Sequence, residues 1–66
     1  MQIKINGKER TISDSATVTA MLKELNINNP MIIIELNRNV IKKNEYNNTI
    51  LSPNDTVEII TLMGGG

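Results

Sequence analysis

Apolar and polar side chains alternate strictly at the start of the chain, over residues 2–6, with Ile3 and Ile5 on the same side. Strict alternation is typical of a β-strand that buries one face. Asn6-Gly7 follows at once, and this dipeptide is a strong signal for a tight hairpin turn because both residues tolerate positive φ. The pattern therefore predicts a β-hairpin whose second strand returns over residues 8–13.

The spacing of apolar residues then changes to a helical period, with positions i, i+3, i+4 and i+7 forming one stripe. The members of this stripe are Val18, Met21, Leu22 and Leu25. Thr17 stands directly before the stripe and is the expected N-cap. Asn26 can end the helix in a left-handed conformation, and Pro30 prevents it from continuing. A helix over residues 18–25 is predicted.

Residues 31–37 are rich in β-branched side chains and predict a third strand. If Glu35 faces solvent, alternation places Ile32, Ile34 and Leu36 on the core face. A turn within residues 37–39 would lead to a short returning strand that begins at Val40.

The remaining part of the chain predicts a loop and one more strand. Residues 42–51 are polar with isolated apolar positions, and we expect a single helical turn near Tyr46. A β-turn at Pro53 precedes the last strand, residues 56–62. Along that strand Val57, Ile59 and Thr61 share one face, and Glu58, Ile60 and Leu62 share the other.

The order hairpin, helix, strand, short strand, strand predicts a two-layer α+β domain, because one helix can cover only one face of a sheet. With the first and last strands parallel in the middle, this is the β-grasp or ubiquitin-like fold, a mixed sheet of four to five strands with one main helix. We expect residues 1–63 to form the domain and residues 64–66 a flexible glycine tail. The predicted core is Ile3, Ile5, Ile12, Val18, Met21, Leu22, Leu25, Ile32, Ile34, Leu36, Val57 and Ile59.

An apolar patch is predicted on the uncovered face of the sheet. If the last strand lies between the first and third, Ile33, Ile60 and Leu62 gather there, and an exposed apolar patch is a usual mark of a protein interface. Lys4, Glu35 and Glu58 would share that face. Two interpretations of the patch stay open. Its apolar residues, together with Met63, bind a partner; or they are covered, because the sheet curls or the loop over residues 42–50 lies on them.

Composition excludes several classes of function. The chain has 66 residues with no cysteine and no histidine, which rules out disulfides, thiolate metal sites and a histidine base. Lys+Arg and Asp+Glu are 7 each and Tyr46 is the sole aromatic residue, a poor basis for binding nucleic acid. The apolar runs are too short to cross a bilayer. We expect a cytoplasmic monomer without metal or intrinsic cofactor that is not itself an enzyme.

Three glycines, Gly64, Gly65 and Gly66, end the sequence. Glycine loses more conformational freedom on ordering than any other residue, so such a run adds nothing to a core. Either the run is inert, or the terminal carboxylate of Gly66 is the functional group of the protein.

At this point the chain resembles a known family. The hairpin "IKINGKER", the helix "TVTAMLKEL", the strands "IIIELNRNVI" and "PNDTVEII", and the terminal "GGG" look like the sulfur carrier proteins of thiamine biosynthesis, the ThiS family. The resemblance covers essentially the whole chain, and "ELNRNVI" and the terminal glycines are its most specific parts.

The resemblance implies a mechanism centred on the last residue. An E1-like, ThiF-type adenylyltransferase would adenylate the Gly66 carboxylate with ATP and magnesium. A sulfur donor such as a cysteine desulfurase would then convert it to a thiocarboxylate, and a ThiG-type thiazole synthase would take up the sulfur. Gly64 and Gly65 would thread into both enzymes, since side chains would obstruct a narrow channel and glycine lets the backbone approach closely.

Two other functions remain open from the residues alone. The small subunit of molybdopterin synthase shares this fold and a diglycine end but delivers sulfur to a different acceptor, and its family tends to be longer. A ubiquitin-like protein-binding module with an inert tail is the second alternative.

Overall fold

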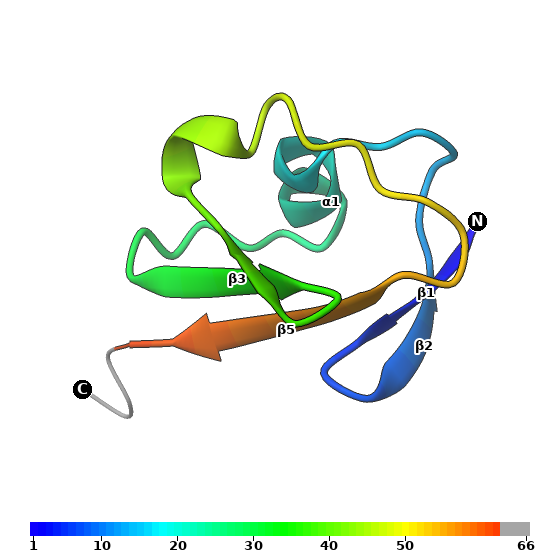
Figure 1. The fold of residues 1–66 in the computed structure, drawn as a ribbon, viewed down its shortest axis with the longest axis horizontal. Helices are drawn as coiled ribbons and strands as arrows, with labels where there is room; N and C mark the ends of the chain where they lie inside the picture. Colours follow the sequence, from blue (N-terminus) through cyan, green and yellow to red (C-terminus); the bar gives the residue numbers. More distant parts are fainter. Residues whose placement is uncertain (63–66) are drawn as a thin grey trace.

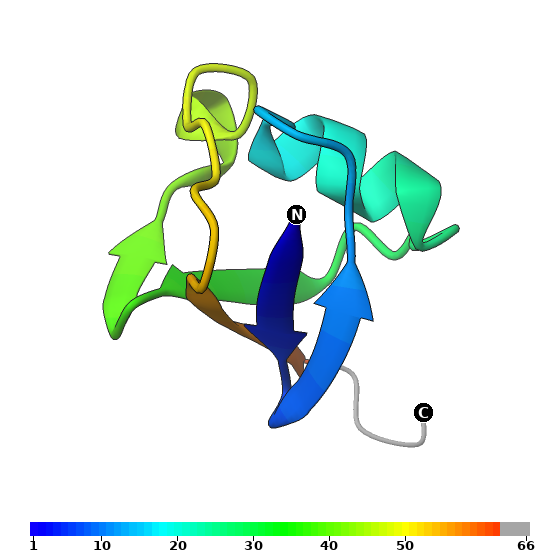
Figure 2. The ribbon, with the colours of Figure 1, turned by 90° about the vertical axis from the view of Figure 1, so that its right-hand side faces the viewer.

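A computed structural model describes residues 1–62, and residues 63–66 lie outside the described part. Its elements are β1 (Gln2–Ile5), β2 (Lys8–Thr11), α1 (Val18–Glu24), β3 (Ile32–Leu36), β4 (Asn39–Ile41), a 3₁₀ turn η1 (Lys43–Glu45) and β5 (Thr56–Thr61). The strands form one sheet, and α1 lies across one of its faces (Figures 1 and 2). This arrangement confirms the predicted β-grasp fold. The predicted boundary between domain and tail falls outside the described residues.

Strand β5 is the central strand of the sheet, whose order is β2-β1-β5-β3-β4. It runs parallel to β1, with Lys4 opposite Thr56, and antiparallel to β3, with Ile32 opposite Thr61. Parallel neighbours need a crossover connection, which α1 supplies. The strand that leads toward the C-terminal residues is therefore held on both sides over its first half.

Two tight turns use residues in the left-handed conformation, as the sequence predicts. Asn6 and Gly7 have φ values of 51° and 83°, and Asn37 and Arg38 have φ values of 49° and 73°. Positive φ at both central residues matches the right-handed twist of the flanking strands. These turns join β1 to β2 and β3 to β4.

Helix α1 is fixed at both ends by local bonds. The backbone N–H of Ala20 donates to Thr17 Oγ1 at 3.1 Å, which makes Thr17 the predicted N-cap. At the other end Asn26 has a φ of 57°, and Ile27 N–H donates to the carbonyl of Leu22 at 2.9 Å. This is the Schellman ending, which satisfies carbonyls that the last turn leaves free.

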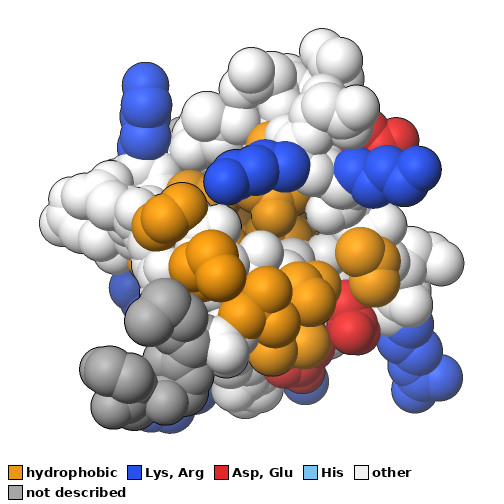
Figure 3. Space-filling view, turned by 90° about the vertical axis from the view of Figure 1, so that its left-hand side faces the viewer, with side chains coloured by type: hydrophobic (Ala, Val, Ile, Leu, Met, Phe, Trp, Pro, Cys, Tyr) orange, Lys and Arg blue, Asp and Glu red, His pale blue; other side chains and the backbone are white. Residues whose placement is uncertain are grey.

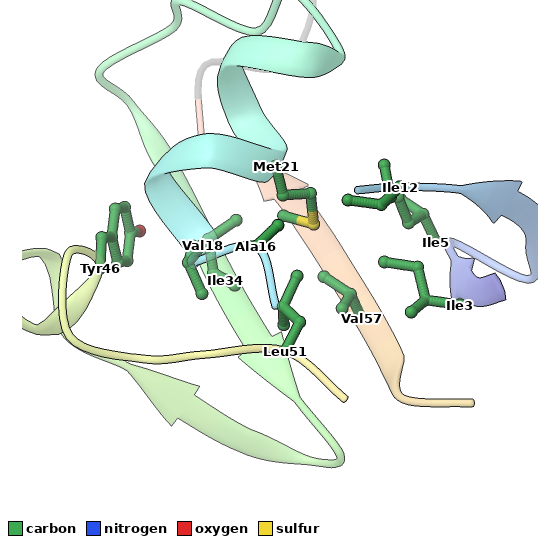
Figure 4. Close-up of a cluster of buried hydrophobic side chains, with 10 residues drawn as sticks. All are labelled: Ile3, Ile5, Ile12, Ala16, Val18, Met21, Ile34, Tyr46, Leu51 and Val57. Atoms are coloured by element: carbon green, nitrogen blue, oxygen red, sulfur yellow. The ribbon is translucent and has the colours of Figure 1, made fainter. Parts of the chain in front are cut away.

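The core between α1 and the sheet contains or contacts every residue predicted for it. Figure 4 shows its buried side chains. Its fully buried side chains include Met21 and Ile34, whose exposed fraction is 0%. Leu22 and Leu25 are half-buried and pack at its margin, because the short helix points Met21 rather than Leu22 at the middle of the sheet.

Three core residues were not predicted: Ala16, Tyr46 and Leu51. They come from segments without regular structure that close the open side of the core. Leu51 N–H donates to the carbonyl of Ala16 at 2.8 Å, and Val18 N–H donates to that of Thr49 at 3.0 Å. The loop after β4 is thereby tied to the start of α1. Tyr46 is almost fully buried, with an exposed fraction of 9%.

Candidate functional site

The C-terminal residues of the predicted site, Met63 and the three glycines Gly64, Gly65 and Gly66, lie outside the described residues. The structure instead shows how the chain is held up to Leu62, the residue before them. Leu62 N–H donates to the carbonyl of Met31 at 2.8 Å, so the pairing with the β3 side continues one residue past the end of β5. The residues after Leu62 are therefore attached to the central strand of the sheet.

Apolar side chains gather on the face of the sheet that α1 does not cover. Ile60 lies opposite Ile33 in the strand register, and Met31 adjoins Leu62 through its backbone bond. We call Met31, Ile33, Ile60 and Leu62 the outer apolar patch. Exposed fractions are 43% for Met31, 41% for Ile60 and 54% for Leu62, while Ile33 is half-buried. Figure 3 faces this end of the molecule and shows hydrophobic side chains gathered there.

The structure brings together the three described patch residues that the sequence predicts, Ile33, Ile60 and Leu62. It adds Met31, which sequence reasoning missed although it has the same parity as Ile33 along the chain. The alternative in which the loop over residues 42–50 covers the patch is wrong. That loop packs on the helix side, where Thr19 N–H donates to the carbonyl of Tyr46 at 3.3 Å.

Charged residues border the outer apolar patch. Glu35 and Glu58 are direct cross-strand partners on this face, and Lys4 shares it one strand further on, opposite Thr56. Like charges placed directly opposite each other destabilise a sheet. A partner that bound the patch could offset this repulsion with basic or polar groups placed next to the two carboxylates, since charge complementarity orients protein association.

The described residues hold no candidate metal site. Residues 1–62 contain no buried polar or charged side chain and no cluster of acidic, histidine or cysteine residues that could hold a metal ion. In the same range, no helix is long and apolar enough to span a membrane. The described part of the site presents an apolar surface and the end of the central strand.

Comparison with known proteins agrees with this architecture. The model of the ThiS family matches residues 3–66. The sulfur carrier protein ThiS of Bacillus subtilis is 31% identical over 65 residues, which is 97% of this chain and 98% of that protein. The crystal structure of a thiamine biosynthesis protein (ThiS) from Geobacter metallireducens superposes with a TM-score of 0.87 at 32% identity, covering 100% of both chains.

A longer relative also contains a similar region. The thiazole synthase of Paramagnetospirillum magneticum is 36% identical over 66 residues, which is 100% of this chain. The chain spans 20% of the length of that protein and 20% of a second thiazole synthase, from Magnetococcus marinus. In both, a region like this chain is part of the same polypeptide as the rest of a thiazole synthase.

Proposed function

The chain belongs to the ThiS family, sulfur carrier proteins of thiamine biosynthesis, and from this premise we propose that it holds sulfur on the C-terminal carboxylate of Gly66. The observation that carries the proposal is that the ThiS family match runs through residue 66, the residue with the terminal carboxylate. The match over nearly the full length of a sulfur carrier ThiS favours the thiamine pathway over the molybdopterin alternative.

The proposed chemistry replaces one oxygen of the Gly66 carboxylate by sulfur. A carboxylate oxygen attacks the α-phosphorus of ATP, the pyrophosphate leaves with magnesium, and an acyl-adenylate forms. Hydrosulfide then attacks the acyl carbon, and AMP leaves with the electrons of the carbon–oxygen bond. If the donor is instead the persulfide of a cysteine desulfurase, an acyl disulfide forms first, and a thiol must reduce its sulfur–sulfur bond to release the thiocarboxylate. ATP, magnesium and donor all belong to the partner enzymes, so the chain acts as their co-substrate.

Glycine suits this task at each of the last positions. Three residues can extend about 10 Å, at roughly 3.3–3.6 Å each, which is enough to carry the carboxylate from a domain surface into an enclosed active site. The lack of side chains at Gly64 and Gly65 lets the backbone pass through a narrow channel. The outer apolar patch on β5 would dock the domain, so that binding energy far from the carboxylate positions it for reaction.

Two partner enzymes follow from this proposal. A ThiG-type thiazole synthase is supported by the two longer relatives in which a similar region accompanies thiazole synthase. A ThiF-type adenylyltransferase is required because a carboxylate needs a leaving group before sulfur can replace its oxygen. We place the reaction in the cytoplasm, where ATP is supplied, and cell fractionation tests that placement.

Intact-mass analysis tests the carrier group. The purified chain is incubated with the adenylyltransferase from the same organism, ATP, magnesium and a sulfide source. The expected product is heavier by the exchange of one oxygen for sulfur. Deletion of Gly66 removes the reacting group from its place, and Gly65→Val obstructs its passage, so neither variant should gain this mass. A thermal melt of each variant checks the fold, and normal loading of either variant would refute the proposal.

A further inference from the structure

A second surface lies on the helix side of the sheet, next to the end of β5. It is a groove of about 440 Å³ between the β1–β2 hairpin, the end of α1 and the start of β3. Its lining includes the apolar side chains of Leu25, Ile27, Ile32 and Ile59 and two basic residues, Lys8 and Arg10. Its volume is within the range of about 300–1,000 Å³ that ligand sites occupy. We call this the inner groove.

The basic residues face the inner groove because of the hairpin register. Lys8 pairs with Ile5 and Arg10 with Ile3, and both isoleucines are buried on the helix side. Among residues 1–62, no carboxylate lines the groove. Within residues 1–62 the one ion pair joins the N-terminal ammonium of Met1 to Asp14. Both basic side chains are therefore available to an acidic group brought by another molecule.

The backbone of Thr61 also faces the inner groove. Leu62 bonds to the β3 side through Met31, so alternation directs the N–H and C=O of Thr61 away from β3, toward the β1 side. However, β1 ends at Ile5, and the last bonds on that side are those between Asn6 and Ile59. In the described chain Thr61 has no strand beside it there, and a free strand edge is a template for pairing with another chain.

We propose that the inner groove binds an extended, acidic and apolar segment of thiazole synthase, which pairs with the backbone of Thr61. Apolar side chains of the segment fill the space above Ile27 and Ile32, and a carboxylate reaches Arg10. Binding of a peptide to a strand edge takes affinity from the backbone and specificity from pockets for alternate side chains. The inference rests on the proposed function, because it names the surface through which the carrier meets the enzyme that takes its sulfur.

Two features favour thiazole synthase as the occupant. The groove adjoins the last residue of β5, so a segment bound there lies beside the point from which the terminal residues enter the enzyme. The two longer relatives named thiazole synthase contain a region similar to this whole chain. In those proteins the region and the rest of the thiazole synthase share one polypeptide, which keeps the two close together.

Binding to thiazole synthase from the same organism, measured by titration calorimetry, tests the inner groove. Arg10→Glu should raise the Kd about tenfold, since a charge pair is replaced by repulsion. Lys23→Glu is the matched control: it makes the same change of net charge on the exposed side of α1, where Lys23 lines no part of the groove, and should leave the Kd unchanged. Ile27→Asn should weaken binding through the loss of apolar contact, with a thermal melt to verify that the variant is folded.

Hydrogen exchange of the Thr61 amide gives a second readout. Exchange should slow about tenfold or more in the complex, because a backbone bond forms at an amide that has no partner among residues 1–62. Equal Kd values for wild type and Arg10→Glu, or unchanged exchange at Thr61 in the complex, would overturn the inference. Slower exchange on raising the concentration of the chain alone would also overturn it, because a second copy would then be the occupant.

Failure of the inner groove and failure of the carrier function give different results. The groove serves thiazole synthase, so Arg10→Glu should be loaded at the wild-type rate in the assay with the adenylyltransferase, ATP, magnesium and a sulfide source. If wild type gains no sulfur, the proposed function is wrong. If wild type gains sulfur and binds thiazole synthase while Arg10→Glu binds it equally well, only the groove is wrong.

Discussion

Two asparagine side chains act as pieces of strand backbone where a neighbouring strand has ended. Ile59 N–H donates to Asn6 Oδ1 at 2.8 Å and Asn6 Nδ2 donates to the Ile59 carbonyl at 3.3 Å. Thr56 N–H likewise donates to Asn37 Oδ1 at 2.9 Å. Both asparagines also have positive φ, so each combines turn formation with a bond to β5. Other residues that tolerate positive φ, such as glycine, could form these turns but could not make the side-chain bonds to β5.

Substitutions at Asn6 separate its two roles. Asn6→Gly keeps the positive φ and loses both side-chain bonds, which should lower the free energy of unfolding by about 1–3 kcal/mol at 0.5–1.5 kcal/mol per bond. Asn6→Ala loses the bonds and also strains the turn, at a further cost of roughly 1–2 kcal/mol. Urea unfolding measures both. A glycine variant as stable as wild type would mean that the amide contributes nothing to holding β5.

Tyr46 should make stability depend on alkaline pH. Burial raises the pKa of its phenol above the ordinary value of 10.0, so the unfolded chain loses the proton more readily than the folded protein. This contribution is fully present below pH 10.0 and is lost as pH rises through the raised pKa. Tyr46→Phe keeps the ring and should lose less stability than wild type between neutral pH and about pH 11. Parallel melting profiles for the two proteins would contradict this.

Elements defined by neighbouring residues were predictable, and those defined by distant contacts were not. The turn at Asn6-Gly7 and the cap at Thr17 follow from local backbone preferences, and the structure confirms both. The burial of Leu51 depends on the path of a long loop toward Ala16, a contact that no local pattern encodes. Periodicity predicted the apolar stripe of α1, but it could not show that Met21 is more deeply buried than Leu22. That difference depends on how the short helix packs on the sheet.

Two substitutions on α1 test that rank. Met21→Ala should destabilise the domain by about 2–5 kcal/mol, the range for a fully buried side chain whose loss leaves a cavity. Leu22→Ala should cost less, since Leu22 is half-buried at the margin of the core. Chemical denaturation of both variants measures the difference. An equal or larger loss at Leu22 would show that the core is centred on the other side of the helix.

The whole molecule exposes apolar surface on both faces of the sheet at the end of β5. The outer apolar patch was largely predictable, because strand parity and the β-grasp order place Ile33 beside Ile60. The inner groove was not, because it depends on where the hairpin stops relative to Thr61 and on the position of Ile27 after the helix. The alternation of residues predicts which face of a strand is apolar. A groove depends in addition on where each strand and helix ends, which alternation does not predict.

Ile60→Asp tests the outer apolar patch. The variant should fold, because Ile60 is 41% exposed, and should lose sulfur loading by about tenfold or more, as expected for a charge placed at the centre of an apolar interface. Ile50→Asp is the matched control, the same change at a residue that is 62% exposed and lies on the loop side. Equal loading rates for the two variants would exclude the patch from docking, and a collapsed melt of Ile60→Asp would mean that the residue supports the fold.

The position of β5 also determines when the protein can fold during synthesis. The ribosome makes this strand after the others, yet it lies at the centre of the sheet, between β1 and β3. Until residues 56–61 emerge, the hairpin and the β3–β4 pair have no common partner and the core lacks Val57, which is 0% exposed in the finished domain. An incomplete chain therefore cannot form the docking surfaces described above. Both surfaces take shape only once β5 has left the ribosome and taken its place between β1 and β3.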